Sequence, residues 1–379
     1  MRVREFTNRE LGAVVAAVCI GEVGLLTTPF ILGGAADRFG LSDAVSGLVP
    51  ALQFVSMTVV AAILAVKIHQ LDRRKLALGG AAIAVSAHFI AAMFSDWYLF
   101  LGSRVGVGIG EGVLLAVGTA TAAATPRPQR TFSIITFGYV VLATAIYLSW
   151  PVMLKEYGSV SIFYIALAIG LVGTPLLFAM PRLDKEGGEA RLLDRDVWRP
   201  FPWILLGIAC LYMGVNSLWA FSERIAVSLD LNHDQIAIAF VVMVLMVPAS
   251  PVAANFVQKR WGYRKPIAVG VILEATACAA LGGALFYEMY FVAFVLMNLA
   301  LLYLVPLYRA LTAVIDPAGR ISAASIVVQA GATALGPALM SLLLLAGGGF
   351  LAVGLFGALL AMLSGAFAWH VARIADNTG

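Results

Sequence analysis

Two charged side chains, Arg104 and Glu111, lie within an otherwise uncharged, apolar stretch of the chain, residues 98–124. Seven residues make about two turns of an α-helix, so both side chains would point the same way, about 10 Å apart along its axis. Charges buried in a membrane are rare and usually mark a substrate or ion pathway. Arg104 is therefore a candidate for binding an anionic substrate group or for stabilising a nearby carboxylate. The alternative is an internal ion pair that only orients helices.

Glycines occupy both faces of this predicted helix. Gly108 falls on the charged face, whereas Gly102, Gly106 and Gly110 fall on the opposite face. Small residues at this spacing let another backbone approach closely. We therefore expect one face to pack against a neighbouring helix and the other to carry charge.

A third charge, Glu22, lies near the middle of another apolar stretch, residues 11–32. A carboxyl group at that depth favours its protonated form unless a cation pairs with it, because desolvation disfavours the ion. This suits a proton carrier, and Glu111 is the alternate candidate. We expect Glu22 to pair with Arg104 in one state of a transport cycle and to separate from it in the other. The alternative is a neutral acid bonded to a backbone carbonyl.

Polar and aromatic side chains recur at helical spacing in other apolar stretches. Tyr212, Asn216 and Trp219, for example, share one face of residues 201–222. Polar residues would otherwise face lipid, so these stripes predict a lined cavity, although packing is the alternative for the aromatic residues. The candidate substrate-binding residues are Arg104, Tyr139, Tyr147, Tyr212, Asn216, Trp219 and Gln329.

The composition explains what must position these residues. Hydrophobic residues make up 61% of the 379 residues and charged residues only 12%, against about 25% charged in a soluble domain. The apolar runs are each about 20 residues long, which is enough to cross a bilayer as a helix. They do not alternate as β-barrel strands would. The twelve predicted spans cover residues 11–32, 44–66, 76–95, 98–124, 132–153, 160–180, 201–222, 236–254, 266–286, 289–311, 321–345 and 348–372.

The loops between these spans differ in charge. Nearly all of the 25 Lys and Arg residues fall on one side of the predicted membrane, and the other side has only Arg38, Lys155 and Arg224. Cytoplasmic loops are the basic ones. The sequence therefore predicts a multi-pass protein of the cytoplasmic (inner) membrane with both termini in the cytoplasm. The net charge of +4 reflects this orientation and does not indicate a nucleic-acid partner.

The chain also resembles itself when it is shifted by about half its length. The basic turn at residues 69–74 then falls on residues 259–264, and the longest charged loop lies at the midpoint. This predicts an N-terminal six-helix bundle (residues 1–180), a cytoplasmic linker (181–200) and a C-terminal six-helix bundle (201–379). Paired halves around a central site suit alternating access.

Several segments carry a family resemblance. Residues 39–42 read Phe-Gly-Leu-Ser before the second span, and residues 69–75 form the basic loop that follows it. Residues 104–110 read Arg-Val-Gly-Val-Gly-Ile-Gly, and Gly336-Pro337 lie in the eleventh span. Together these segments resemble the major facilitator superfamily over the whole chain.

The resemblance implies the major facilitator fold, with spans one, four, five, seven and eleven lining the cavity. It also implies a gating role for loop residues between spans. The fifth span lacks the Gly-Pro motif of the family's antiporters, and His69 stands where the loop usually has an acid. The implied gating-loop residues are Asp72, Arg73, Arg74 and Arg264.

These observations predict a secondary active transporter that moves a small organic solute by alternating access, coupled to protons. The alternatives are a drug or metabolite efflux antiporter, an uncoupled facilitator, and a non-transporting membrane sensor or scaffold. No arrangement typical of an enzyme is present, and the dispersed cysteines Cys19, Cys210 and Cys278 lack metal-ligand spacing. We expect no cofactor, no metal and a monomer. An aromatic or amphipathic organic anion and a hydrophobic drug both fit as substrate, and transport direction is open.

Overall fold

The structure of the protein, a computed structural model, describes residues 6–125, 127–181, 201–315 and 320–378. Within these ranges the chain forms helices joined by turns, and no strand is present. Helices are expected because a segment in lipid must satisfy its backbone hydrogen bonds internally. The predicted class, an all-α membrane protein, is confirmed.

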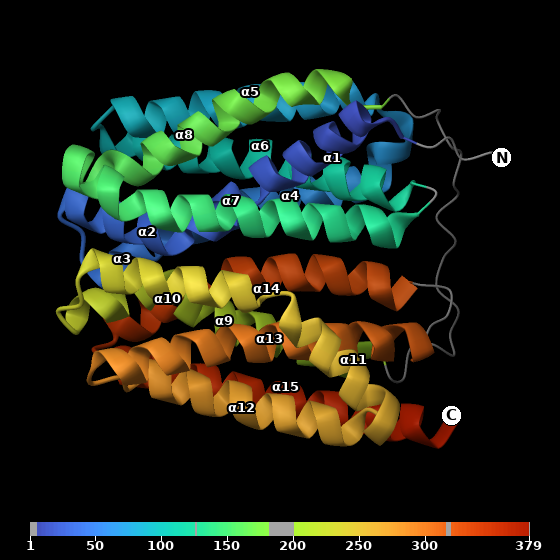
Figure 1. The fold of residues 1–379 in the computed structure, drawn as a ribbon. Helices are drawn as coiled ribbons and strands as arrows, with labels where there is room; N and C mark the ends of the chain where they lie inside the picture. The colour runs from blue at the N-terminus through green and yellow to red at the C-terminus, as the bar shows by residue number, and fades with distance from the viewer. Residues whose placement is uncertain (1–5, 126, 182–200, 316–319, 379) are drawn as a thin grey trace. The chain divides into compact units, whose positions relative to one another are not determined.

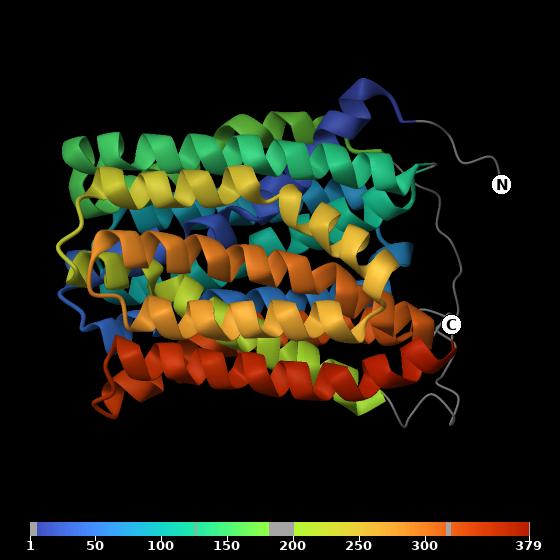
Figure 2. The ribbon, with the colours of Figure 1, turned by 60° about the horizontal axis from the view of Figure 1, so that its bottom comes forward.

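Contacts between the helices group the chain into two compact units. Unit 1 comprises Met1–Leu41 and Leu52–Ala190, and unit 2 comprises Ser42–Ala51 and Arg191–Gly379. In each unit the helices lie side by side along a common direction (Figures 1 and 2). The predicted linker lies outside the described residues, except for residue 181.

The helices of the first half are α1 (Asn8–Gly21), α2 (Val23–Phe39), α3 (Asp43–Ser46), α4 (Leu48–Lys67), α5 (Arg73–Met93), α6 (Trp97–Ala123), α7 (Pro128–Tyr157) and α8 (Ser161–Gly173). Those of the second half are α9 (Phe201–Ser228), α10 (His233–Met246), α11 (Ala249–Trp261), α12 (Arg264–Gly282), α13 (Tyr287–Ile315), α14 (Arg320–Leu345) and α15 (Phe350–Thr378).

In the described part of the chain, ten helical stretches are long and apolar enough to cross a membrane, or eleven if the bent pair α10 and α11 forms one span. One of the ten, Pro128–Ala179, contains both α7 and α8 and therefore two predicted spans. Counted in this way, the helical stretches match the twelve predicted spans, and α1 with α2, α3 with α4, and α10 with α11 each make up one span.

The eighth span is not the straight helix that the sequence predicts over residues 236–254. It bends by 42° between α10 and α11, and Pro248 is the residue immediately before α11. Proline has no backbone N–H to donate, and its ring clashes with the carbonyl of the preceding turn. The bend therefore has a local cause in the sequence.

The first span is also interrupted, at a functionally interesting residue. The helix α1 ends at Gly21 and α2 begins at Val23, so Glu22 forms the turn between them. The Glu22 backbone N–H donates to the Val18 carbonyl at 3.0 Å, which closes α1. The first N–H groups of a new helix have no partner within that helix. The Gly24 N–H in the first turn of α2 donates to a side chain of another helix.

The helix α6 packs through glycines on two sides. A side chain at Gly110 would come within 2.5 Å of the Ala84 backbone nitrogen on α5, and one at Gly106 would touch the Ala87 side chain. Both glycines therefore pack as predicted, whereas Gly102 has open space around it. Gly108, on the other face, contacts the backbone of α4 at Gln53. This close approach brings α4 between the two charges of α6.

Unit 2 includes a short piece of the first half of the chain. Residues 42–51, with α3 and the start of α4, belong to it by their contacts. The Arg224 Nε atom on α9 donates to an Asp43 carboxylate oxygen at 2.7 Å, and a side chain at Gly47 would collide with Phe221 and Ser341. The division by contacts thus differs from the predicted halves at this segment.

Candidate substrate and proton site

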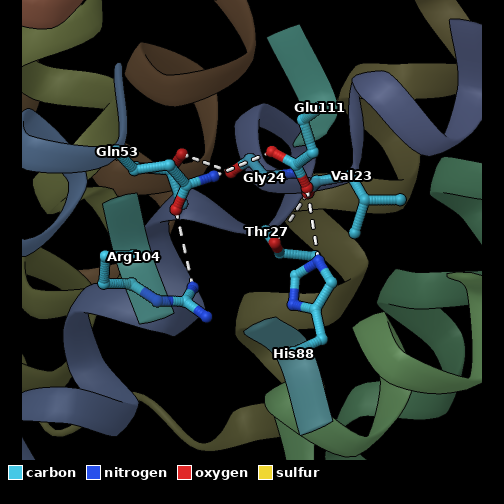
Figure 3. Close-up of polar contacts among 8 residues, drawn as sticks. Val23, Gly24, Thr27, Gln53, His88, Arg104 and Glu111 are labelled. Carbon is cyan, nitrogen blue, oxygen red and sulfur yellow. Dashed lines mark hydrogen bonds and ion pairs between the residues drawn. The ribbon is translucent and has the colours of Figure 1, made fainter. Parts of the chain in front are cut away.

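Arg104 and Glu111 lie on the same face of α6, as their spacing predicts, and neither side chain reaches solvent in unit 1. The α4 residue Gln53 lies between them (Figure 3). Its position follows from Gly108, because a side chain at that point of α6 would occupy the space of the α4 backbone. The two charges are therefore linked through a third residue.

Glu111 accepts hydrogen bonds on both carboxylate oxygens. The Gly24 backbone N–H donates to Oε1 at 3.0 Å, and the Gln53 Nε2 group donates to Oε2 at 2.9 Å. Gly24 is in the first turn of α2, where N–H groups have no partner within the helix and the helix dipole favours negative charge. The carboxyl group of Glu111 thus completes the N-terminus of a helix that begins inside the membrane.

His88 of α5 is the third neighbour of Glu111. Its Nε2 atom lies 3.4 Å from Glu111 Oε1, and both side chains are buried. The other ring nitrogen, Nδ1, has no hydrogen-bond partner among the described residues. His88 can therefore donate to Glu111 or accept from it, depending on which nitrogen carries the proton.

Arg104 has unused hydrogen-bonding capacity. One of its nitrogens, NH1, donates to Gln53 Oε1 over a long distance of 3.5 Å. Within the described part of the chain, Nε and NH2 have no hydrogen-bond partner. The guanidinium lies over the rings of Phe100 and Phe163, 5.4 and 5.5 Å from their centroids. These rings partly stabilise the cation but leave two donors unmatched.

Glu22 approaches the same region from the turn between α1 and α2. It lies within electrostatic reach of Glu111 and of Tyr139 on α7. Among the described residues it forms no ion pair with Arg104, whose side-chain acceptor is Gln53. The structure thus brings Glu22, Glu111, Arg104 and Tyr139 into one region of unit 1, without the expected pair between Glu22 and Arg104.

Tyr147, also predicted to bind substrate, is packed inside unit 1. Its hydroxyl donates to the Leu26 carbonyl of α2 at 3.2 Å, and its ring packs on Phe30. The side chain is fully buried. These contacts hold α7 against α2.

The remaining predicted binding residues belong to unit 2. Tyr212, Asn216 and Trp219 lie along α9, and Asn216 donates from Nδ2 to the Tyr212 carbonyl at 2.8 Å. The Trp219 ring stacks on Phe294 with centroids 5.8 Å apart. Gln329 is on α14, which packs along α9, and it is partly exposed.

The predicted gating-loop residues make contacts within their own units. Asp72 caps α5 by accepting from the N–H groups of Arg74 and Lys75. Arg73 donates to the Ala120 carbonyl at the end of α6 at 3.2 Å. In unit 2, the guanidinium of Arg264 lies 4.4 Å from the centroid of the Trp369 ring.

Sequence reasoning missed Gln53 and His88. Both are polar residues in otherwise apolar spans, and that was the available signal. Neither shares a helix with Arg104 or Glu111, so no sequence spacing connects them. Their role depends on the packing of α4 and α5 against α6.

Two family profiles match the chain. One described as Major Facilitator Superfamily matches residues 13–205, and one described as Sugar (and other) transporter matches residues 184–314. None of the curated protein sequences compared with the chain matches it.

Solved structures of similar fold cover nearly the whole chain. The POT family transporter PepTSo has a TM-score of 0.77 at 10% identity, covering 98% of this chain and 99% of its own. The nucleoside transporter NupG (D323A mutant) has a TM-score of 0.76 at 13% identity, with 95% and 99% covered. A bacterial homolog of the human lysosomal transporter Spinster, inward-facing and occupied, has a TM-score of 0.75 at 16% identity, with 96% of both chains covered. Identities this low establish the fold alone.

Proposed function

The chain belongs to the major facilitator superfamily and is a secondary transporter. From that premise we propose that it moves a small organic solute with an anionic group by proton-coupled alternating access. The observation that carries the proposal is Arg104, a buried cation with two unmatched donors beside a hydrogen-bonded carboxylate. A planar guanidinium with free donors matches a carboxylate or phosphate group in geometry and charge.

The charges of the region explain why a proton would move with the solute. Arg104 is one cation and Glu111 is one acid on the same face of α6, and a second acid, Glu22, follows Gly21, which packs against the Glu111 backbone. Uncompensated charge is costly in a buried site, so one of the two acids carries a proton while the other balances Arg104. An anion that binds Arg104 adds a negative charge, which favours uptake of a second proton. Anion and proton therefore each strengthen the binding of the other.

The proposal extends to the residues outside this region. Tyr139 and Tyr147 in unit 1 and Tyr212, Asn216, Trp219 and Gln329 in unit 2 contribute to the solute path, with the loops around Asp72 and Arg264 at its cytoplasmic side. The protein acts as a monomer in the cytoplasmic membrane with both termini in the cytoplasm. The distribution of Lys and Arg among the loops supports this orientation.

A ligand screen and a flux assay together test the proposal. A panel of small organic anions is first screened for a rise in thermal stability of the purified protein, since ligands that bind the folded state stabilise it. A hit is then measured for uptake into proteoliposomes with and without an imposed pH gradient. We expect uptake that follows the gradient. Uptake that ignores the gradient supports an uncoupled facilitator, and no uptake of any stabilising ligand supports a sensor or scaffold.

Substitutions at Arg104 test the site itself. Arg104→Ala should abolish uptake and the ligand-induced stabilisation while leaving expression near that of the wild type. Arg104→Lys should restore little, because lysine lacks the planar fork that grips two oxygens at once. Full uptake by Arg104→Ala would remove this residue from the site.

A further inference from the structure

Gln53 forms hydrogen bonds with both charges of α6. Its Oε1 atom accepts from Arg104, and its Nε2 group donates to Glu111. It is 1% exposed, and its backbone lies against Gly108. The proposed transport mechanism gives this amide no role, although the amide lies between the solute-binding cation Arg104 and the acid Glu111.

The orientation of the amide depends on its two neighbours. Arginine is a donor only, so the side of Gln53 that faces Arg104 must be the oxygen. The NH2 group is then directed to Glu111 Oε2, which must accept. The Gly24 N–H already donates to the other carboxylate oxygen. The observed arrangement therefore fits an ionised Glu111, whose two oxygens both face donors.

A proton on Glu111 Oε2 is incompatible with this arrangement. The new O–H would face the NH2 group of Gln53, and two donors would meet. Rotation of the Gln53 amide by half a turn removes the conflict, because Oε1 then accepts from the Glu111 hydroxyl. The same rotation directs the NH2 group at Arg104, which loses its acceptor. Arg104 then requires another acceptor, and an anionic solute supplies one.

We infer that Gln53 is a positioning residue that couples the protonation of Glu111 to the availability of Arg104 for an anionic solute, by rotation of its side-chain amide. This inference rests on the proposed function, which it deepens by naming the coupling element. The proton comes from water on one side of the membrane, resides on Glu111 Oε2, and leaves to water on the other side. The hydrogen bonds exchanged are those of Gln53.

Other groups near Glu111 offer one competing route. The titratable or charged groups that face it are Arg104 on α6, His88 on α5 and Glu22 at the turn before α2. A proton on Oε1 could be accepted by His88 Nε2, at 3.4 Å. That route would leave Gln53 in place and Arg104 still engaged. The two routes therefore differ in whether the Gln53 amide responds to pH.

The first experiment needs no solute, so it remains decisive if transport is never observed. Infrared difference spectra are recorded on the reconstituted full-length protein as the pH is changed. The carboxyl band of Glu111 is assigned by its loss in Glu111→Gln, and the amide band of Gln53 by its loss in Gln53→Met, which keeps the length of the side chain. We expect both bands to change together over the same pH range. A Gln53 band that stays constant while the Glu111 band titrates would overturn the inference.

The second experiment uses a solute identified by the flux assay. Gln53→Met should still exchange labelled for unlabelled solute, because Arg104 remains. The measured quantity is the ratio of accumulation under a pH gradient to exchange. This ratio should fall about tenfold or more in Gln53→Met, because that factor corresponds to the loss of one hydrogen bond to a charged group. Ser56→Ala, one turn further along α4, removes a hydroxyl bonded only to its own helix and should leave this ratio unchanged. Equal ratios in Gln53→Met and wild type contradict the inference, whereas wild-type uptake that ignores the gradient contradicts the proposed function.

Discussion

Among single residues, Gly24 and Gly108 set the geometry of the buried site by having no side chains. Gly108 lets α4 approach α6 at Gln53, and Gly24 lets Glu111 reach the start of α2. A side chain at Gly24 would overlap both Gln53 Nε2 and the Glu111 carboxylate. The polar contacts of the site therefore depend on positions that carry no polar group.

Gly24→Ala should disable the site while a matched change in the same span does not. The added methyl group forces the Gln53 and Glu111 side chains apart, and overpacking of this kind typically costs about 1–3 kcal/mol. Thermal unfolding and proton-coupled uptake are the measurements. Gly12→Ala, in α1, has nothing within 4 Å of the new methyl group and is the control. Equal behaviour of the two variants would show that Gly24 is not constrained by the site.

Glu111→Gln and Glu22→Gln separate the two candidate proton carriers. Each mimics a permanently protonated acid, so the variant of the true carrier should keep solute exchange but lose accumulation under a pH gradient. The contacts of Glu111 with Gly24 and Gln53 favour Glu111 as the carrier. Gradient-driven accumulation by Glu111→Gln equal to that of the wild type would pass the role to Glu22.

The residues of the site were only partly predictable. The shared face of Arg104 and Glu111 followed from helical spacing within one span. The pair between Arg104 and Glu22 was expected in one state of the cycle and stays a prediction, and in this structure Arg104 donates instead to Gln53 from α4. Contacts between different helices depend on how closely their backbones approach, and a single sequence does not encode that distance in any local spacing.

At the scale of elements, α6 has a charged face and a glycine face, and each contacts other helices. Its charged face meets α2, α4 and α5 through Glu111, and its glycine face packs on α5. The sequence predicted both faces and the twelve spans. It did not predict the break at Glu22, where the sequence has no proline to indicate an interruption. It did not predict the bend between α10 and α11 either, although Pro248 was a signal for it.

Gly110→Ala should destabilise the protein, and Gly102→Ala on the same face should not. A methyl group at Gly110 would lie 2.6 Å from the Gly80 carbonyl oxygen, whereas one at Gly102 meets nothing within 4 Å. We expect a loss of about 1–3 kcal/mol for the first change and no loss for the second, since alanine favours helices by up to about 1 kcal/mol over glycine. Unfolding midpoints in detergent give the comparison. Similar midpoints for both variants would contradict the observed packing of α5 on α6.

The start of α12 is held by the end of α15, and this contact can be tested in the same way. Asp376 accepts from the N–H groups of Tyr263 and Arg264 at 2.9 and 3.3 Å. Gly262 (φ +70°) and Gly347 (φ +86°) both adopt a backbone conformation that favours glycine, but only a side chain at Gly262 would contact Asp376, at 2.9 Å. Gly262→Ala should therefore lower the unfolding temperature more than Gly347→Ala. Equal losses would show that backbone strain alone accounts for both.

At the scale of the whole molecule, the predicted halves can be compared with the two units that the contacts define. The sequence predicted two halves joined at the midpoint, and contacts group the chain into two units with residues 42–51 in the second. Each unit is built from helices of the kind that the hydrophobic pattern predicts. The grouping of residues 42–51 had no signal in the pattern, because packing partners decide it.

Orientation in the membrane is a prediction that single cysteines can test. A cysteine-free variant is given one cysteine at Lys155, Asp230 or Lys185, the last of which lies outside the described residues. In sealed right-side-out vesicles, an impermeant thiol reagent should label positions 155 and 230 but not 185. After the vesicles are opened, position 185 should react as well. Labelling of 185 in intact vesicles would reverse the predicted orientation.

The backbone donor at Gly24 also bears on how this site can diverge in evolution. Every amino acid except proline supplies the same N–H group, so no side chain has to be preserved for the first turn of α2 to receive an acid. The requirement at position 24 is one of volume, because any side chain there would overlap Gln53 and Glu111. Amide-to-ester replacement at residue 24 would remove the donor while leaving every side chain intact.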